Sequence, residues 1–581
     1  MVVIEFPIRS ILFIALTACT CQFTFAQDNV QRYFESDEST IFDNNDVASS
    51  NRDGSNPIVT VKKIDISKLI EMPEYGINKD ELEIIIRNDQ KENNFKYTVD
   101  RLEHLAEKIS LHYKKQGLIL AKAYFPPQDL KNNSLYLDVV LGEIESITTK
   151  RNDYYSSERL IRPFKDILNK PAYIPTLESS LIELNNYPGI SLNTHFQEGT
   201  DLGKTQIDIR VDDEKISDFN FSFDNYGSEY TGSMRAMLKA NFYNLADQAD
   251  QLNLSLLATI DPTNSVYVGA SYKFKVAPFF NSRFLNSTFR HGWNTTLGFQ
   301  QTDYVAGGDI EAIDYEGKAS TLYLKLDKDF ILRNSHKLNS GFILSKKEAK
   351  TIQGGNENSS DNLAIFTWST QFKWNDHIGT PSANLIHFEF HQGLPGFAGS
   401  DENNDPNLNL SRYGFVNGVS NVPAPLDYKR YNLILTRNQG VGPYRFVSKL
   451  NVQYSDDMLL ASEQSNLGGA NSVRGYKNSD FSSDRSNILT FELIGRSNAR
   501  KYAMPISDLQ LAGFVDYGLG ERLHPFGSEE DQVEMLSIGG YALFLSEGKF
   551  SSKMEIAMPL NEVGDSKKNG LEILFNFERG F

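Results

Sequence analysis

The chain has 581 residues, a formal net charge of -17 and a mean hydropathy of -0.40. That length suits roughly two to four domains rather than one. The acidic charge argues against nucleic-acid binding, which usually needs a basic face, and the hydropathy excludes a helical membrane protein. Aromatic residues make up 12% of the chain, as β-strands and the aromatic girdles of membrane barrels would require.

Residues 1–26 have the pattern of a secretory signal peptide. The stretch from Ile11 to Cys21 is apolar, and Thr24-Phe25-Ala26 puts small residues at both positions that determine cleavage, so we expect cleavage after the alanine. A second interpretation is lipoprotein processing, because Leu16-Thr17-Ala18-Cys19 resembles a lipoprotein cleavage box and would leave a lipidated cysteine. Both cysteines of the chain lie in this segment, so cleavage after the alanine leaves no disulfides and no thiol chemistry.

Residues 27–56 form a polar, acidic segment that is rich in Asn, Asp and Ser. This composition predicts a disordered linker. The alternative is a short helix from Val30 to Glu38 that plugs a pore.

Residues 57–141 and 142–215 are expected to form two similar α/β modules, because strand-like runs alternate with runs of helical period. The first module has the expected order strand IVTVKKIDI, helices Asp80–Asn88 and Val99–Gln116, and strands LILAKAYF and SLYLDVVL. The second has the expected order strand GEIESITTK, helix Thr176–Asn186, and strands ISLNTHFQ and TQIDIRV. Gly117 and Pro188-Gly189 are the stop signals of the two longer helices.

From residue 216 to 581 the helical period disappears, and roughly every second position is apolar in segments of about 10 to 14 residues. Sixteen such segments begin near Asp218, Gly232, Asp250, Ser265, Trp293, Ser320, His336, Leu363, Ser382, Asp427, Tyr444, Ser486, Asp508, Met535, Phe550 and Leu571. We expect an all-β, 16-stranded antiparallel transmembrane β-barrel, because a closed barrel is the only sheet that leaves no unpaired edge in lipid. A soluble β-sandwich would also alternate, but sixteen segments after a signal sequence, without disulfides, favour the barrel.

The alternation assigns faces to single strands. In the thirteenth segment, Leu511 and Val515 face outward, whereas Phe514 and Asp516 face the lumen.

One connection fits the topology poorly. Residues 277–292, after the fourth segment, span about fifteen residues where a short periplasmic turn is expected.

Two motifs lie in the second half of the expected barrel. LGGANSVRGY, from Leu467 to Tyr476, lies in a connection from about Ser455 to Arg485, between the eleventh and twelfth segments. An F-x-D-x-G motif, Phe514-Val515-Asp516-Tyr517-Gly518, lies on the thirteenth segment. Three further stretches are YKKQGLILAKAYFPPQDLKNNSLYLDVVLGEIESI, TLESSLIELNNYPGISLNTHFQEGTDLGKTQIDIRV and FDNYGSEYTG. Together these stretches resemble the two-partner secretion outer-membrane transporters (TpsB-type, the haemolysin secretion/activation protein family) of the superfamily that combines POTRA domains with a barrel.

The resemblance runs over nearly the whole mature chain and implies its domains and site. It implies POTRA domain 1 at residues 57–141, POTRA domain 2 at 142–215 and a barrel at 216–581, with the motif-bearing extracellular loop at about 455–485. The implied site residues are Val473, Arg474, Gly475 and Tyr476 in that loop and Phe514, Asp516 and Gly518 on the barrel wall. In this family the loop folds back into the pore, so the resemblance implies a pair between Arg474 and Asp516. The alternative is an ordinary extracellular loop with a surface arginine.

The C-terminus also resembles the family. Phe581, after Phe575 and Phe577, is similar to the C-terminal aromatic signature that the barrel assembly machinery reads, and the alternative is a plain strand end. Two departures stand out. The segment before the first POTRA domain is short and acidic instead of a clear plug helix with a long linker, and Gly580 separates Arg579 from the final aromatic residue.

The resemblance implies an outer-membrane translocator. Its POTRA domains, in the periplasm, would bind an unfolded adhesin- or haemolysin-like exoprotein, and its pore would secrete that partner. We expect a monomer in outer-membrane lipid, inserted by the barrel assembly machinery, with no cofactor and no nucleic-acid partner. The alternatives are a barrel assembly or insertion factor, which usually carries more POTRA domains, and a passive porin-like channel, which would leave residues 57–215 without a role.

Catalytic and metal-binding motifs are absent from the sequence. It contains no G-x-S-x-G, Walker loop, H-E-x-x-H or metal-binding Cys pair, so we expect neither an enzyme nor a metal site. His387 and His391 share a face of one predicted strand, but at about 3.3 Å per residue they are roughly 13 Å apart, too far to bind one metal together. We interpret each histidine as structural or as part of the wall lining.

Overall fold

The computed structural model describes residues 58–581 except 67–71, 131, 202, 261, 277–291, 404, 406, 498–507, 547–548 and 565. The expected signal peptide, the acidic segment with its candidate plug helix, and nearly all of the long connection after the fourth barrel strand lie outside the described residues. The described chain forms two compact units, and the main division falls between Glu214 and Lys215.

The first module of the N-terminal unit packs two helices against short strands. The helices are α2 (Lys79–Glu92) and α3 (Val99–Lys115), and a 3-10 turn, η3 (Pro73–Tyr75), precedes them. The strands are β1 (Val59–Thr60), β2 (Lys63–Asp65), β3 (Lys96–Tyr97), β4 (Lys122–Tyr124), β5 (Ser134–Tyr136) and β6 (Asp138–Val140). On α3, Leu105, Ile109 and Tyr113 recur at helical spacing and are fully buried in the core. Both long helices predicted for this module are confirmed.

Two predicted strands of this module are too long because the chain changes partner within them. IVTVKKIDI forms two strands: β1 pairs antiparallel with β3, and β2 pairs parallel with β5. SLYLDVVL divides at the buried Leu137, since β5 pairs with β2 whereas β6 pairs with β4. Apolar alternation shows that a stretch is extended but not which strand it joins. The lengths predicted for these strands are therefore wrong.

The second module is a three-stranded sheet with short helices. β7 (Glu143–Lys150) pairs parallel with β9 (Lys204–Glu214), and β9 pairs antiparallel with β8 (Ile190–Glu198). The predicted helix is α5 (Ile174–Asn185). The prediction missed α4 (Ser157–Ile161) and η4 (Arg162–Ile167), because each is too short to show a helical period. Among the described residues, none of the helices has both the length and the apolar composition needed to span a membrane.

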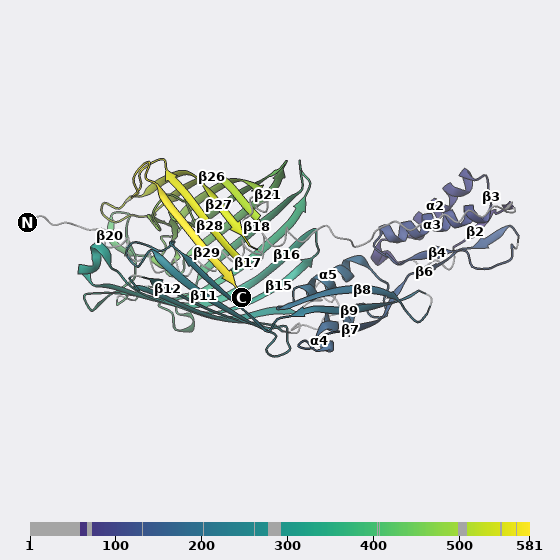
Figure 1. Cartoon of the computed structure of the whole chain (residues 1–581), viewed down its shortest axis with the longest axis horizontal. Coiled ribbons are helices and arrows are strands. Elements are labelled where there is room, and N and C mark those ends of the chain that lie inside the picture. Colours follow the sequence, from purple (N-terminus) through teal and green to yellow (C-terminus); the bar gives the residue numbers. More distant parts are fainter. Residues whose placement is uncertain are drawn as a thin grey trace, which may run out of the picture. The chain divides into compact units, whose positions relative to one another are not determined.

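The C-terminal unit is a closed antiparallel barrel of sixteen strands (Figure 1). In order around the barrel these are β10 (Ser217–Asp224), β11 (Met234–Tyr243), β12 (Gln251–Ile260), β13 (Ser265–Val276), β14 (Trp293–Val305), β15 (Tyr315–Leu332), β16 (His336–Gln353), β17 (Asn356–Asp376), β18 (Ser382–Gly393), β21 (Lys429–Val441), β22 (Tyr444–Ser455), β25 (Arg485–Ser497), β26 (Asp508–Glu521), β27 (Gln532–Leu545), β28 (Phe550–Pro559) and β29 (Glu572–Gly580). β29 pairs with β10, from Asn220 opposite Gly580 to Asp224 opposite Asn576, and this pairing closes the barrel. The predicted barrel of sixteen strands is confirmed.

Two barrel strands begin about five or more residues before the predicted residue. β15 starts at Tyr315 rather than near Ser320, and β17 starts at Asn356 rather than near Leu363. The stretch by which β17 is longer, NENSSDN, is polar, yet it pairs with the end of β16. A strand that continues beyond the lipid needs no apolar face, so alternation cannot mark where it starts.

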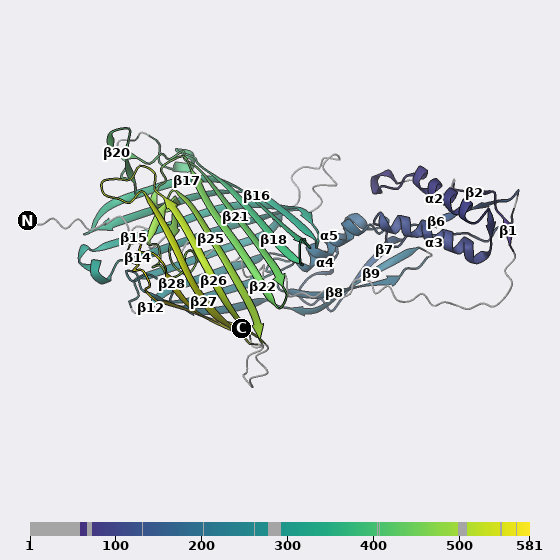
Figure 2. The ribbon, with the colours of Figure 1, turned by 90° about the horizontal axis from the view of Figure 1, so that it is seen from above.

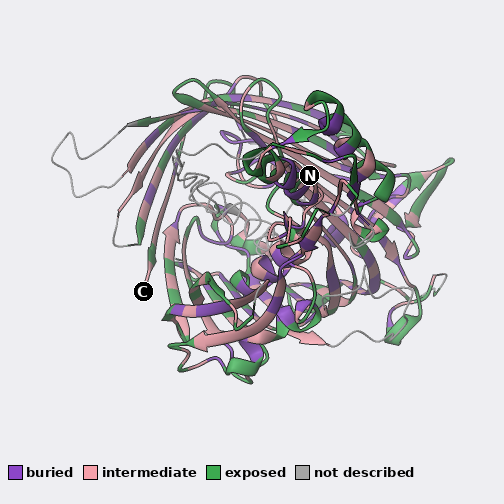
Figure 3. Cartoon of the chain, turned by 90° about the vertical axis from the view of Figure 1, so that its right-hand side faces the viewer, coloured by how far each residue is buried: buried purple, intermediate pink, exposed green. Residues whose placement is uncertain are grey.

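Burial alternates along the barrel strands, and the ribbons change colour along their length in Figure 3. On β26, Phe514 is 3% and Asp516 is 0% exposed, whereas Leu511 is 54% and Val515 is 40% exposed. The face assignment made for this strand is therefore confirmed. The outward apolar side chains give the wall a surface that suits lipid.

Two long connections lie at the same end of the barrel, because they follow its ninth strand, β18, and its eleventh strand, β22. Figure 2 shows the tilted strands side by side. Residues 394–428 contain η6 (Phe397–Gly399) and a hairpin of β19 (Tyr413–Val416) and β20 (Val419–Pro423). Residues 456–484 contain η7 (Ala461–Glu463) and the paired strands β23 (Ser465–Leu467) and β24 (Phe481–Ser483). A shorter connection at this end holds η5 (Gly308–Ile313).

Candidate functional site

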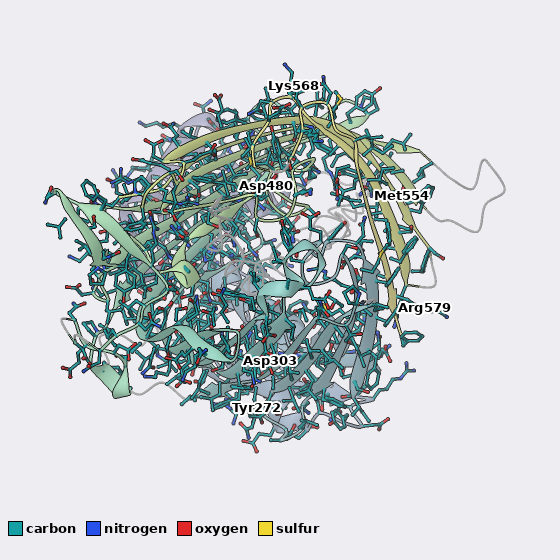
Figure 4. The ribbon with its side chains drawn as sticks, turned by 90° about the vertical axis from the view of Figure 1, so that its left-hand side faces the viewer. Tyr272, Asp303, Asp480, Met554, Lys568 and Arg579 are labelled. Atoms are coloured by element: carbon teal, nitrogen blue, oxygen red, sulfur yellow. The ribbon has the colours of Figure 1, made fainter. Side chains whose placement is uncertain are left out.

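Residues 456–484, here named the pore loop, connect β22 with β25. Its two limbs pair through β23 and β24, so residues 468–480 form its tip. Figure 4 views the barrel from the end that carries this loop, and Asp480 of the tip lies within the ring of strands whereas Met554 lies on the wall. The tip therefore occupies part of the lumen.

Arg474, in the tip, forms a bidentate ion pair with Asp516 on β26. Its Nε donates to Asp516 Oδ2 at 2.7 Å, and its Nη2 donates to Asp516 Oδ1 at 2.8 Å. The backbone N–H of Arg474 also donates to Asp516 Oδ2, at 3.2 Å. Arg474 is 5% and Asp516 is 0% exposed, so water competes little with this pair. The fork of two parallel hydrogen bonds fixes the orientation of the loop as well as its charge.

Two further carboxylates and a ring complete the surroundings of the guanidinium. Arg474 Nη1 donates to Glu492 Oε1 on β25 at 2.8 Å and lies 3.4 Å from Glu555 Oε2 on β28. Its Cζ lies 3.4 Å from the centre of the Phe514 ring, which is a cation–π contact. One side chain thus ties the pore loop to three strands of the wall.

Glycines let the tip approach the wall closely. Gly475 has a φ of +90°, a left-handed conformation that favours glycine. A Cβ at this position would also lie 3.1 Å from the backbone nitrogen of Pro559. On β26, Gly518 leaves the space that the side chain of Val473 fills. A side chain at either glycine would therefore push the tip away from the wall.

Tyr476 fixes the part of the tip that follows Arg474. Its hydroxyl lies 3.0 Å from the carbonyl of Leu536 on β27 and 2.5 Å from Asn561 Oδ1. Its buried ring belongs to an apolar cluster that also contains Val473 of the tip and Met535 of the wall. The four loop residues of the motif therefore hold the tip by charge, shape and apolar packing.

The tip is held to the wall by ion pairs, hydrogen bonds and apolar packing. A guanidinium that faces three carboxylates is compensated while the loop is seated, although burying these charges costs hydration free energy. The ion pairs offset that cost as long as Arg474 and the three carboxylates remain together.

Phe581 lies just beyond β29, at the seam of the barrel. Its N–H donates to the carbonyl of Phe219 on β10 at 2.8 Å, and its ring lies 5.1 Å from Arg579 Cζ. The side chain is 61% exposed. It is therefore accessible from outside the barrel.

His387 and His391 lie on β18 with Glu389 between them. The Nε2 atom of each histidine lies 3.4 Å from a different oxygen of Glu389. Among the described residues, no group of three or more His, Cys, Asp or Glu side chains could hold a metal ion. Glu389, which was not predicted from the sequence, joins the two histidines into one polar row on the wall.

Sequence reasoning also missed Glu492 and Glu555, although the signal was available. Each is a single carboxylate between apolar neighbours, in FEL and MEI. On a barrel strand that pattern places the charged side chain in the lumen. Only the F-x-D-x-G motif drew attention to one acidic residue, so two of the three partners of Arg474 were overlooked.

Comparison with protein-family models matches residues 203–543 to the haemolysin secretion/activation protein ShlB/FhaC/HecB and residues 89–142 to the ShlB-type POTRA domain. The first match covers more than half of the chain. The chain belongs to the ShlB/FhaC/HecB family. As a member of this family it is an outer-membrane transporter that secretes a protein partner through its barrel, and the predicted two-partner secretion function is confirmed.

Individual relatives agree with membership of the ShlB/FhaC/HecB family. The chain is 23% identical over 500 residues to the heme/hemopexin transporter protein HuxB of Haemophilus influenzae, covering 81% of this chain and 79% of the relative. It is 21% identical over 478 residues to the outer membrane transporter CdiB of Dickeya dadantii, covering 80% and 77%. The solved structure of CdiB from Escherichia coli superposes with a TM-score of 0.73 at 17% identity and covers 97% of this chain and 98% of that one. The fold is therefore shared over almost the whole length.

Proposed function

We propose that the two N-terminal modules bind the secreted partner in an unfolded form, and that movement of the pore loop then opens its path through the barrel. The observation that carries this proposal is the buried cluster of Arg474 with Asp516, Glu492 and Glu555. It holds a loop inside the lumen by contacts that can be broken and remade.

Residues 57–141 and 142–215 are the proposed POTRA domains 1 and 2. The edge of the second sheet supports capture of an extended chain, since among the described strands β8 pairs with β9 alone. The open side of such a strand offers backbone N–H and C=O groups to an unfolded partner, whatever the partner's side chains are. We propose an adhesin- or haemolysin-like protein as this partner, in keeping with the family's haemolysin secretion role.

The same proposal includes the lipid around the barrel, the machinery that inserts it and its oligomeric state. Outer-membrane lipid would cover the exposed apolar side chains of the wall, such as Leu511 and Ile556. The accessible Phe581 would be read by the barrel assembly machinery. A monomer is proposed because the closed ladder leaves no strand edge for a second barrel.

The test is secretion of the partner by cells that carry Arg474→Ala, together with single-channel recordings of the purified protein in planar bilayers. We expect secretion to collapse while the variant still inserts and conducts, with more frequent openings than the wild type. Unchanged secretion and unchanged conductance would reduce the motif to a surface loop and would favour a porin-like or assembly role.

A further inference from the structure

The limb of the pore loop that leads from β22 to the tip, residues 456–467, carries a second buried charge. Glu463, the last residue of η7, is 2% exposed. Its Oε1 lies 2.8 Å from Lys347 Nζ on β16, and its Oε2 lies 2.8 Å from Arg430 Nη1 on β21. The backbone carbonyl of Glu463 accepts hydrogen bonds from Arg430 Nη1 at 2.8 Å and from Gln453 Nε2 at 3.2 Å. This glutamate is therefore held through both its side chain and its backbone.

The partners of Glu463 lie on a different sector of the wall from those of Arg474. Lys347, Arg430 and Gln453 belong to β16, β21 and β22, whereas the carboxylates around Arg474 belong to β25, β26 and β28. The charges are also inverted. An acidic loop residue faces basic wall residues on one sector, and a basic loop residue faces acidic wall residues on the other.

We infer that Glu463 is a second anchor of the pore loop, and that opening the path for the secreted partner requires release of both anchors. This inference rests on the proposed movement of the loop. Glu463 is a positioning residue in this scheme, since it acts by fixing the limb from which the Arg474 tip extends.

The two anchors hold different parts of the pore loop: Arg474 holds the tip, and Glu463 holds the limb that leads to it. With Arg474 seated and the Glu463 carboxylate removed, the limb that leads to the tip would lose both ion pairs and keep its backbone hydrogen bonds to Lys347 on β16 and Arg430 on β21. Neutralising Glu463 would also leave Lys347 and Arg430 near each other without the carboxylate that compensates them. Buried like charges repel, so the attachment of the limb to the wall would be weakened.

The first experiment compares Glu463→Gln with Glu348→Gln in planar bilayers. Glu348 adjoins Lys347 in the chain but is exposed, so its substitution removes the same charge without touching the anchor. We expect Glu463→Gln to raise the frequency of channel openings by about tenfold, as the loss of a charge-assisted hydrogen bond would. Glu348→Gln should behave as the wild type. Glu463→Asp, which keeps the charge on a shorter side chain, should give an intermediate frequency.

The second experiment combines Glu463→Gln with Arg474→Ala. If opening requires release of both anchors, their free-energy contributions add, and the double variant should open more often than either single variant. Heat-modifiable migration in gels establishes that each variant contains a closed barrel. A merely structural Glu463 would make the barrel less heat-resistant and leave the openings of folded protein unchanged, and that result would overturn the inference.

The variants distinguish a failure of the second anchor from a failure of the proposed loop movement. If Arg474→Ala alters openings and secretion while Glu463→Gln and Glu463→Asp alter neither, the second anchor is wrong and the proposed function stands. If Arg474→Ala also alters neither, the proposed movement of the loop is wrong, and the second anchor falls with it.

Discussion

The side chain of Val473 fills the space that a side chain at Gly518 would need: a Cβ at Gly518 would lie 2.6 Å from Val473 Cγ2. Real Cβ atoms do not approach a neighbouring carbon so closely. The glycine of the F-x-D-x-G motif and the valine that precedes Arg474 are therefore complementary in shape, next to the residues that are complementary in charge.

This complementarity predicts the effect of Gly518→Ala. The added methyl group should displace the tip at a cost of about 1–3 kcal/mol, as overpacking usually does. Because the displacement acts on the tip and not on the strand ladder, bilayer recordings should show more frequent openings of an otherwise normal barrel. Gly513→Ala is the matched control on the same strand, since a Cβ at Gly513 would meet only the carbonyl of Gly539 at 4.0 Å. Equal behaviour of the two variants would mean that this shape contact does not hold the loop.

Arg474→Lys tests the geometry of the anchor rather than its charge. A lysine ammonium cannot reproduce the fork on Asp516 while also reaching Glu492, so we expect the loss of at least one charge-assisted hydrogen bond, worth about 1.5–3 kcal/mol. Secretion should fall to a level between those of the wild type and Arg474→Ala. Arg437→Lys is the control, because Arg437 pairs with Asp376 elsewhere in the barrel. Full secretion by Arg474→Lys would show that a single positive charge suffices.

The sequence was informative where one strand or one motif decides the structure. Alternation alone placed Asp516 in the lumen, and the family resemblance that the two motifs carry implied Arg474 as its partner. It was uninformative where distant segments must be matched. Lys347 lies 116 residues from Glu463, and the sequence around neither residue predicts that the two form a pair. The same limit explains why IVTVKKIDI was not recognised as two strands with different partners.

A third buried ion pair joins the loops at the same end of the barrel. Arg412, from residues 394–428, donates through Nη1 to Asp484 Oδ1 at 2.6 Å, and Asp484 is fully buried. Asp484 also accepts the backbone N–H groups of Leu459 and Leu523. One carboxylate therefore connects residues 394–428, the pore loop and the connection between β26 and β27 that contains Leu523.

We expect Asp484→Asn to loosen these loops without opening the barrel wall. An uncompensated buried Arg412 should cost about 3–5 kcal/mol, which exceeds what an isolated surface pair contributes. Protease added to intact cells should then cut residues 394–428 faster than in the wild type. Asp456→Asn serves as the control, since Asp456 is exposed where it pairs with Arg485. Equal cleavage rates in the two variants would contradict a role for Asp484 in holding the loops.

In the second N-terminal module, Asp208 on β9 is a buried carboxylate. Its Oδ2 accepts a hydrogen bond from Lys150 Nζ at 2.8 Å, and its Oδ1 accepts one from Thr148 Oγ1 at 3.0 Å. The hydrogen bond from Lys150 is the main cause that lowers the pKa of Asp208 from its ordinary 3.8. A carboxylate with a lowered pKa in the folded state stabilises that state above its ordinary pKa, and the stabilisation is lost as the pH falls through the folded-state value.

Because the pKa of Asp208 is lowered in the folded state, Asp208→Asn should destabilise the module at neutral pH and not in acid. At about pH 7 the variant should be less stable than the wild type by about 1–2 kcal/mol, and the difference should vanish once the pH falls below the lowered folded-state pKa of Asp208, where both side chains are neutral. Hydrogen exchange of β9 amides in the full-length protein, corrected for the intrinsic effect of pH, measures this difference locally. Asp213→Asn is the control, because Asp213 is exposed on the same strand. A difference between Asp208→Asn and the wild type that persists unchanged into acid would show that shape, not charge, makes Asp208 stabilising.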